Sequence, residues 1–207
     1  MAPFDKQVLA YDDLTPKPVL AQLALDQDPA VRSQVAKNPN TPPPALATLA
    51  KDKDRHIIFS LSQNPSTPPA TLLYLASDEN WAVRQTVSCN ICAPAKALQK
   101  LAFDQDAGVR EAVIQNPNTP PSLLTAMYYD MVQKDALSEW LAIAFIRKNF
   151  LPQTELCALV ALFGQRVAEV IADNIAVAKG SALEKTLLLR GFKINKRPRI
   201  KERNKLH

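Results

Sequence analysis

The sequence repeats with a period of 26 residues, and this period limits the folds open to the chain more than any other feature. The motif NPNTPP at positions 38–43 returns as NPSTPP at 64–69 and as NPNTPP at 116–121. Other columns keep the same spacing, with one residue type at equivalent places: Asn38, Asn64, Asn90 and Asn116; Leu20, Leu46, Leu72, Leu98 and Leu124; Asp26, Asp52, Asp78 and Asp104; Arg32, Arg84 and Arg110. A period of this length is typical of proteins that stack similar units along one axis.

Each unit contains the signals for two short helices. In the first, we predict that Thr41 caps the helix and that Pro42 occupies its first turn, with apolar residues following at helical spacing. In the second, Asp28 is the predicted cap, and Val31 and Val35 are predicted core residues ahead of the Asn-Pro corner. The cap column continues with Asp54, Asn80 and Asp106. The pattern therefore predicts helix pairs without strands.

The length and pattern of the unit narrow the choice among helical repeats. Tetratricopeptide and ankyrin repeats are longer, at about 34 and 33 residues, and HEAT repeats run to about 40 to 47. The patterns L-x-x-L-A-x-D and V-R-x-x-V-A-x-N-P-x-T-P resemble the leucine-rich repeat variant family over about residues 12–130. The resemblance implies an all-α, right-handed solenoid of two layers, one α-helical and one 3-10 in character. Repeat two departs from the pattern, with Ile57-Ile58 in place of Val-Arg.

After residue 122 the register loosens. Helical patterns continue at about 122–131, 140–146, 152–163 and 167–174. Ser181 and Glu184 form a capping box that opens a last helix, which we expect to end near Arg190. We therefore divide the chain into a regular solenoid at 1–130, with repeats starting near 15, 41, 67, 93 and 119, degenerate repeats and a C-terminal cap at 131–190, and a tail at 191–207.

Charge is distributed unevenly between the body and the tail. Residues 190–207 hold eight bases against one acid, whereas residues 1–189 hold 17 bases against 19 acids. The eight bases are Arg190, Lys193, Lys196, Arg197, Arg199, Lys201, Arg203 and Lys205. A local excess of positive charge favours a nucleic acid or another acidic partner for the tail, or alternatively only improves solubility.

Other features of the sequence bear on location. No apolar run is long enough to span a membrane, and residues 1–13 lack the pattern of a signal peptide. Three cysteines, an odd number, argue against a disulfide framework. We expect a cytoplasmic protein that does not contact a membrane.

The repeated polar residues have structural explanations, so binding is expected at exposed positions where the repeats differ. The Asn, Asp and Thr columns serve corners and caps, and Arg32 is expected to pair with Asp26 or with the same column of a neighbouring repeat. Trp81 stands out because its column otherwise holds Pro29, Arg55 and Ala107. An exposed tryptophan there would stack on a base or anchor a protein partner, or it would cover a gap beside Tyr74. Arg55 and His56 in the preceding repeat are predicted to extend this surface.

Catalytic and metal sites have little support in the sequence. Cys89 and Cys92 form a C-x-x-C pair, but the remaining ligand candidates are scattered, so we predict neither a metal site nor a redox role. Some members of the family carry an iron-sulfur cluster on an N-terminal cysteine-rich segment, but residues 1–12 contain no cysteine, and we expect no cofactor. Common phosphate-binding and hydrolase motifs are missing from the sequence.

These observations favour a non-catalytic binding scaffold or adaptor that engages a protein partner, with the basic tail contacting an acidic partner. The first alternative is a nucleic-acid-binding module in which the solenoid supplies shape and the tail supplies charge. The second is an enzyme similar to helical-repeat DNA glycosylases, which would use Trp81, Trp140 and an acid such as Asp78.

Overall fold

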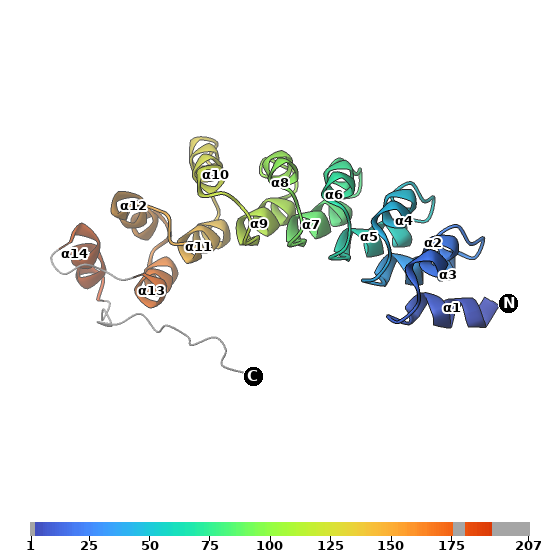
Figure 1. Ribbon diagram of the computed structural model, residues 1–207. Helices are drawn as coiled ribbons and strands as arrows, with labels where there is room; N and C mark the ends of the chain where they lie inside the picture. Colours follow the sequence, from blue (N-terminus) through green and yellow to red (C-terminus); the bar gives the residue numbers. More distant parts are fainter. Residues whose placement is uncertain (1–2, 176–180, 192–207) are drawn as a thin grey trace. The chain divides into compact units, whose positions relative to one another are not determined.

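The chain is all-helical, without strands, over residues 3–175 and 181–191, which are the residues that the computed structural model describes (Figure 1). The helices of these residues are α1 (Pro3–Tyr11), α2 (Lys17–Leu23), α3 (Pro29–Lys37), α4 (Pro43–Leu49), α5 (Arg55–Gln63), α6 (Pro69–Leu75), α7 (Trp81–Cys89), α8 (Ala95–Leu101), α9 (Ala107–Gln115), α10 (Pro121–Gln133), α11 (Glu139–Arg147), α12 (Gln153–Phe163), α13 (Gln165–Asn174) and α14 (Ala182–Leu189). They belong to two compact units, unit 1 at residues 1–120 and unit 2 at 121–207. The boundary expected near residue 130 falls inside α10.

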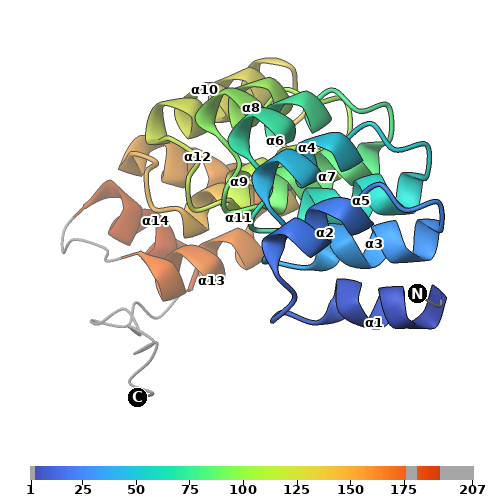
Figure 2. The same ribbon diagram turned by 45° about the vertical axis from the view of Figure 1, so that its right-hand side comes forward.

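Unit 1 is a solenoid of two helical layers. Helices α1, α3, α5, α7 and α9 form one layer, in which each helix packs against the next (Figures 1 and 2). The shorter helices α2, α4, α6 and α8 form the other layer, and each packs against the longer helix that follows it. Every 26 residues the chain therefore completes one helix pair, as the sequence period predicts.

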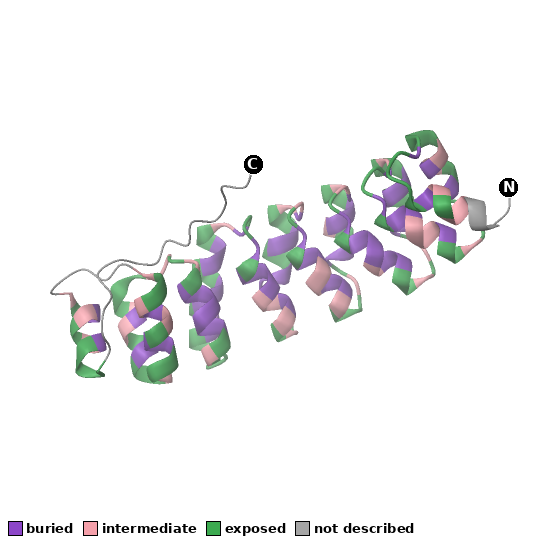
Figure 3. Cartoon of the chain, turned by 90° about the horizontal axis from the view of Figure 1, so that it is seen from below, coloured by how far each residue is buried: buried purple, intermediate pink, exposed green. Residues whose placement is uncertain are grey.

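The core of unit 1 lies between the two layers. Leu20, Leu46, Leu72 and Leu98 are all fully buried, at 0% exposure. Val31 and Val35 of α3 are buried as predicted, while exposed residues concentrate at helix ends and corners (Figure 3). Because burying one such side chain contributes about 1.5 to 3 kcal/mol, the repeated apolar columns supply most of the stability of the stack.

The predicted caps of the longer helices are confirmed. The Asp28 carboxylate accepts a hydrogen bond of 2.8 Å from the Ala30 amide, and the side chains of Asp54 and Asn80 cap α5 and α7 in the same way. Asp106 caps α9 through the amide one residue further on, that of Val109, at 3.1 Å. These bonds satisfy backbone amides that have no partner inside the first turn of a helix.

The resemblance implied that one of the two layers is 3-10 in character, without saying which. In unit 1 both layers are α-helical, the short helices α2, α4, α6 and α8 included. One prediction about the short helices is wrong. Thr41 does not cap α4, because the N-cap is Pro42 and the Thr41 hydroxyl turns back to donate to the Val35 carbonyl at 2.6 Å. The same bond is made by Thr15, Thr67 and Thr119. Threonine therefore closes the end of the preceding long helix instead of opening the short one.

Unit 2 retains the alternating packing with less regular helices. Helix α11 packs on α13, and α12 packs on both α13 and α14. The buried Tyr128 donates to the Glu155 carboxylate at 2.8 Å and meets Phe145 edge to face. Burial raises the pKa of the Tyr128 hydroxyl, and the bond to Glu155 raises it further. The serine half of the predicted capping box is present, since the Ser181 hydroxyl accepts from the Glu184 amide at 3.1 Å.

A search of the described residues for membrane-crossing segments finds no helix with the length and apolar character that a bilayer span requires.

Candidate partner-binding surface

The first edge of unit 1, which we call the Asn edge, consists of the corners at residues 38–42, 64–68, 90–94 and 116–120. Asn64 is buried there, and its side-chain amide donates to the carbonyls of Ala36 at 2.8 Å and Asn38 at 2.9 Å in the preceding repeat. Its carbonyl oxygen accepts from the Ser66 amide at 2.8 Å. The other asparagines of the column repeat this pattern: Asn38, Asn90 and Asn116. These asparagines join successive repeats, so their role is structural.

The opposite edge, the Asp edge, consists of residues 22–30, 48–56, 74–82 and 100–108, which are the Asp corners and the helix ends that flank them. Arg32 donates from Nε and Nη2 to both carboxylate oxygens of Asp52 in the next repeat, at 2.7 and 3.1 Å. Its Nη1 donates to the backbone carbonyls of Asp26 at 2.8 Å and Gln27 at 3.0 Å. Arg32 was expected to pair with Asp26 or with the neighbouring repeat. Its ion pair is with the Asp52 carboxylate of the next repeat, and its own repeat contributes only backbone carbonyls.

The second complete copy of this arrangement is formed by Arg84. It binds both carboxylate oxygens of Asp104, at 2.7 and 2.9 Å, and the carbonyls of Asp78 and Glu79, both at 2.9 Å. Arg110 makes only the two carbonyl bonds, at 2.7 and 3.0 Å, and its buried Nε has no partner within the described residues.

The two bidentate ion pairs lower the pKa values of their carboxylates, Asp52 and Asp104, and so favour the charged forms. Hydrogen bonds from Arg32 lower the pKa of Asp52 against the opposing effect of burial. For Asp104 burial is the largest influence, but bonds from Arg84 and the Asp106 amide together outweigh it, and its pKa is also lowered. The carboxylates of Asp52 and Asp104 therefore stay ionised and paired near neutral pH.

Repeat two lacks an arginine in this column because position 58 is isoleucine. Ile58 is buried, with 2% of its surface exposed. The Asp78 carboxylate of the next corner is instead reached by Arg55, which starts α5 one turn earlier and whose side chain is 53% exposed. Arg55 contacts a single oxygen, Oδ1, which also accepts from the Asn80 amide. The substitute arginine is thus more exposed and makes fewer bonds than Arg32 and Arg84, whereas the Asp78 side chain is about as buried as its counterparts, at 10% exposure.

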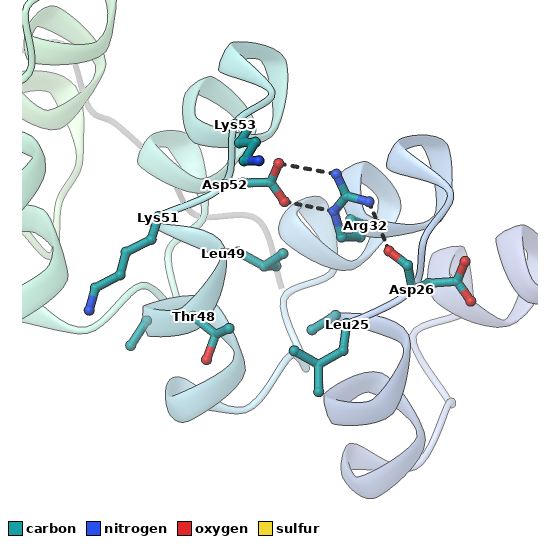
Figure 4. A pocket seen from close by; sticks show the side chains of 10 residues that line it. Leu25, Asp26, Arg32, Thr48, Leu49, Lys51, Asp52 and Lys53 are labelled. Carbon is teal, nitrogen blue, oxygen red and sulfur yellow. Dashed lines mark hydrogen bonds and ion pairs between the residues drawn. The ribbon is translucent and has the colours of Figure 1, made fainter.

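Pockets open along the Asp edge between successive repeats. One, of about 720 Å³, is lined by Leu25, Arg32, Thr48, Lys51 and Asp52 among others (Figure 4). Figure 4 shows the Arg32 guanidinium between the Asp52 carboxylate and the backbone of Asp26. A second pocket, of about 620 Å³, lies one repeat further along. The two are related by the repeat, because most of the lining positions differ by 26 residues.

Large apolar side chains are exposed on the same edge. Trp81, at the first position of α7, is 52% exposed, as predicted for a residue outside the core. Phe103 is 49% exposed and Tyr74 is 61% exposed. The ring contacts found in the described residues all lie between residues 128 and 150, so Trp81 does not stack on Tyr74. Arg55 and Trp81 occupy equivalent positions in successive repeats, and Arg55 reaches Asp78 in the corner that follows it. By the same register, Trp81 lies beside the corner one repeat further on, which contains Phe103.

Arg55 and His56 lie on this edge as expected from the sequence, and both are exposed. Arg55 has the added structural role of pairing with Asp78. His56 contributes its backbone amide to the Asp54 cap, which leaves its ring available at the surface. Trp81, Arg55 and His56 thus belong to one edge of unit 1.

The remaining candidates are less informative. Cys89 is exposed and Cys92 half-buried, and no group of three metal-ligating side chains occurs in residues 3–175 and 181–191. Burial raises the pKa of the Cys89 thiol, and the nearby Glu111 raises it further, which disfavours the reactive thiolate. Asp78, a candidate acid for the glycosylase alternative, is held by Arg55. Arg190 is exposed at the end of α14, and the other basic residues proposed for the tail lie outside the described residues.

The sequence reasoning did not identify Leu25, Phe103 or Tyr74 as binding candidates. Leu25 and Phe103 belong to one column, which holds lysine at 51 and serine at 77. This column changes between apolar, charged and polar residues, whereas a column that faces the core keeps similar apolar residues. That variation was the sign in the sequence that the column is exposed. Tyr74 belongs to another variable column, with Gln22, Thr48 and Lys100.

Comparisons with curated proteins and with solved structures found no match. The comparison with family models did find one, and it falls on the most regular part of unit 1. Residues 29–54, one full period of the repeat, match the model of the leucine rich repeat variant family, which confirms the resemblance drawn from the sequence.

Proposed function

We propose that this protein is a non-catalytic binding scaffold whose Asp edge engages a segment of a protein partner. The observation that carries the proposal is the exposure of Tyr74, Trp81 and Phe103 on one edge, at positions that the repeat does not require to be apolar. Tryptophan and tyrosine are the residues most enriched among those that dominate binding energy in protein interfaces. The four corners of the Asn edge expose one large apolar side chain, Ile91, and the equivalent corner at the N-terminal end of unit 1 exposes Tyr11 and Leu14.

The arrangement of the edge supports a protein partner. The pockets between repeats form a row, so an extended segment has several places in which to insert side chains along α4, α6 and the following corners. Exposed charges of both signs, Lys51, Lys53 and Glu79, flank the apolar residues. A mixture of apolar anchors and a charged rim is typical of protein interfaces, whereas a surface that binds nucleic acid is dominated by positive charge.

The first prediction concerns Trp81. A photo-crosslinking residue at position 74 should capture the partner, and one at position 63 on α5 should not. With the captured protein purified, Trp81→Ala should weaken its affinity by about 30-fold, as expected for loss of an interface anchor worth roughly 2 kcal/mol. The melting temperature should change little, because Trp81 is half-exposed at the start of α7.

The matched control is Gln63→Ala, which alters an exposed residue at the far end of the neighbouring helix α5 and should leave the affinity unchanged. Equal affinity of wild type and Trp81→Ala would show that the Asp edge is not the binding surface. If the captured molecule is a nucleic acid and binding disappears on removal of residues 193–207, the scaffold proposal is replaced by the nucleic-acid alternative.

A further inference from the structure

The corners of the Asp edge form a binding site for a guanidinium group, and two arginines of the solenoid itself, Arg32 and Arg84, occupy such sites. In both copies the donors Nε and Nη2 face a carboxylate of the next repeat, and Nη1 faces two successive backbone carbonyls. This geometry matches the planar, forked shape of guanidinium and satisfies several of its donors at once. The acceptors belong to the corners, so they recur with the 26-residue period whichever residue occupies the arginine column.

Between repeats two and three, the corners supply the equivalent hydrogen-bond acceptors, but the arginine column holds Ile58 instead of arginine. By the register, the equivalent acceptors are the carbonyls of Asp52 and Lys53 and the carboxylate of Asp78. Ile58 has no donor to offer them. Arg55 reaches only Oδ1 of Asp78, and within the described residues no bond to its Oδ2 is found.

A pocket of about 620 Å³ opens at this step, and its lining includes Asp52, Ile58, Asp78 and Arg55. It corresponds by the repeat to the pocket at whose floor Arg32 lies. The side chain of Arg55 lines this pocket and is itself 53% exposed, and its displacement breaks a single bond to Asp78, which the guest guanidinium would replace. The pocket therefore gives a side chain from outside access to the same acceptors.

We propose that this corner, which we call the guest corner and define by the Asp52 and Lys53 carbonyls and the Asp78 carboxylate, binds the guanidinium of an arginine side chain supplied by the protein partner. The identity of the donor as a partner protein rests on the proposed function above. A lysine ammonium is a poorer match, because it presents a point charge rather than a planar fork to the carboxylate. Arg55 competes for Asp78, so it opposes entry of the guest arginine.

The direct test uses the full chain and a small probe, Nα-acetyl-argininamide, with Nα-acetyl-lysinamide as the control. Titration followed by backbone amide chemical shifts should move the signals of Lys53, Asp54, Glu79 and Asn80, and the lysine probe should bind more weakly. Ile58→Arg should abolish these shifts, because its own guanidinium fills the corner, whereas Ile58→Leu should retain them. Equal shifts at the corners that already hold Arg32 and Arg84, or persistence of the shifts in Ile58→Arg, would overturn the proposal.

Two further variants keep the test decisive even where Ile58→Arg does not fold. Asp78→Asn retains an acceptor for the Asn80 amide but removes the charge, and should weaken the probe by about tenfold. Arg55→Gln removes the competing cation and should strengthen it. A probe affinity that is unchanged in Asp78→Asn would contradict the guest corner.

Affinity measurements with the partner captured by crosslinking distinguish failure of this inference from failure of the proposed function. Loss of partner affinity in both Ile58→Arg and Trp81→Ala supports both. If Trp81→Ala loses the partner and Ile58→Arg binds it as wild type does, the partner does not use the guest corner and this inference is wrong, while the scaffold proposal stands. If Trp81→Ala binds normally but the probe occupies the corner, the scaffold proposal fails and the guanidinium site remains.

Discussion

Replacement of Asn90 by alanine should lower the free energy of unfolding by roughly 3 kcal/mol, because it leaves several buried backbone groups without partners. The Asn90 amide donates to the carbonyls of Ser62 at 2.9 Å and Asn64 at 3.1 Å, and its oxygen accepts from the Cys92 amide at 2.8 Å. Only 7% of the residue is exposed, so water cannot replace these bonds. Denaturant unfolding followed by circular dichroism measures the loss.

The matched control for Asn90 is Asn118→Ala. Asn118 also donates to a carbonyl of the preceding repeat, that of Ile91, but it is exposed at the surface. Its removal should cost less than about 1 kcal/mol, since water solvates the groups it leaves. Similar losses for the two variants would mean that burial does not determine the strength of the Asn edge.

Arg84→Met should destabilise unit 1 by about 3 to 5 kcal/mol, because it leaves the Asp104 carboxylate buried without its counter-ion. Both side chains of the pair are only 9% exposed. The pair of Arg55 and Asp78 provides the comparison, because Asp78 is similarly buried at 10% exposure but Arg55 is 53% exposed and reaches a single carboxylate oxygen. Arg55→Gln should therefore cost less than Arg84→Met. The double variant Arg84→Met/Asp104→Asn should recover part of the loss, since the asparagine keeps an acceptor for the Asp106 amide without a charge.

The pH dependence of the Arg84 variant should be opposite to that of the wild type. In the wild type the pKa of Asp104 is lowered, so the pair stabilises the fold above the unfolded value of about 3.9 and this stabilisation is lost as pH falls through the folded pKa. Without Arg84, burial is opposed only by the Asp106 amide and the charge of Arg110, so we expect the pKa of Asp104 to rise above its unfolded value. The variant should therefore gain stability as pH falls from 7 toward 5, whereas the wild type should not. Parallel profiles over this range would contradict the assigned pairing.

The fold was predictable because the same residue types recur in register. Once Asn38 and its copies set the period, the leucine and valine columns could only face a shared core, and the caps followed from Asp28. Thr41 was misassigned because a threonine before proline is compatible with two bonds, one to a free amide ahead and one to a carbonyl behind. Only the path of the corner shows that its hydroxyl meets the Val35 carbonyl.

The candidate site was less predictable, since a period alone does not give distances between repeats. Asp26 and Asp52 share one column, so the sequence left open which of them Arg32 contacts. The substitution at Ile58 was visible, but the response of Arg55, reaching Asp78 from the previous turn, depends on the arrangement of the corners. Trp81 was recognised because it breaks its column, whereas the column of Leu25 and Phe103 has no dominant residue from which a departure stands out.

The bonds along both edges have a consequence for how such a gene evolves. Each asparagine amide reaches carbonyls 26 and 28 residues before it, and each complete arginine pair spans 20 residues. A tandem duplication or deletion of one whole period in the regular part of unit 1 thus adds or removes matched donors and acceptors together. Unequal recombination can change the number of repeats without orphaning a buried polar group, while an insertion that is not a whole number of periods separates donors from acceptors where it falls.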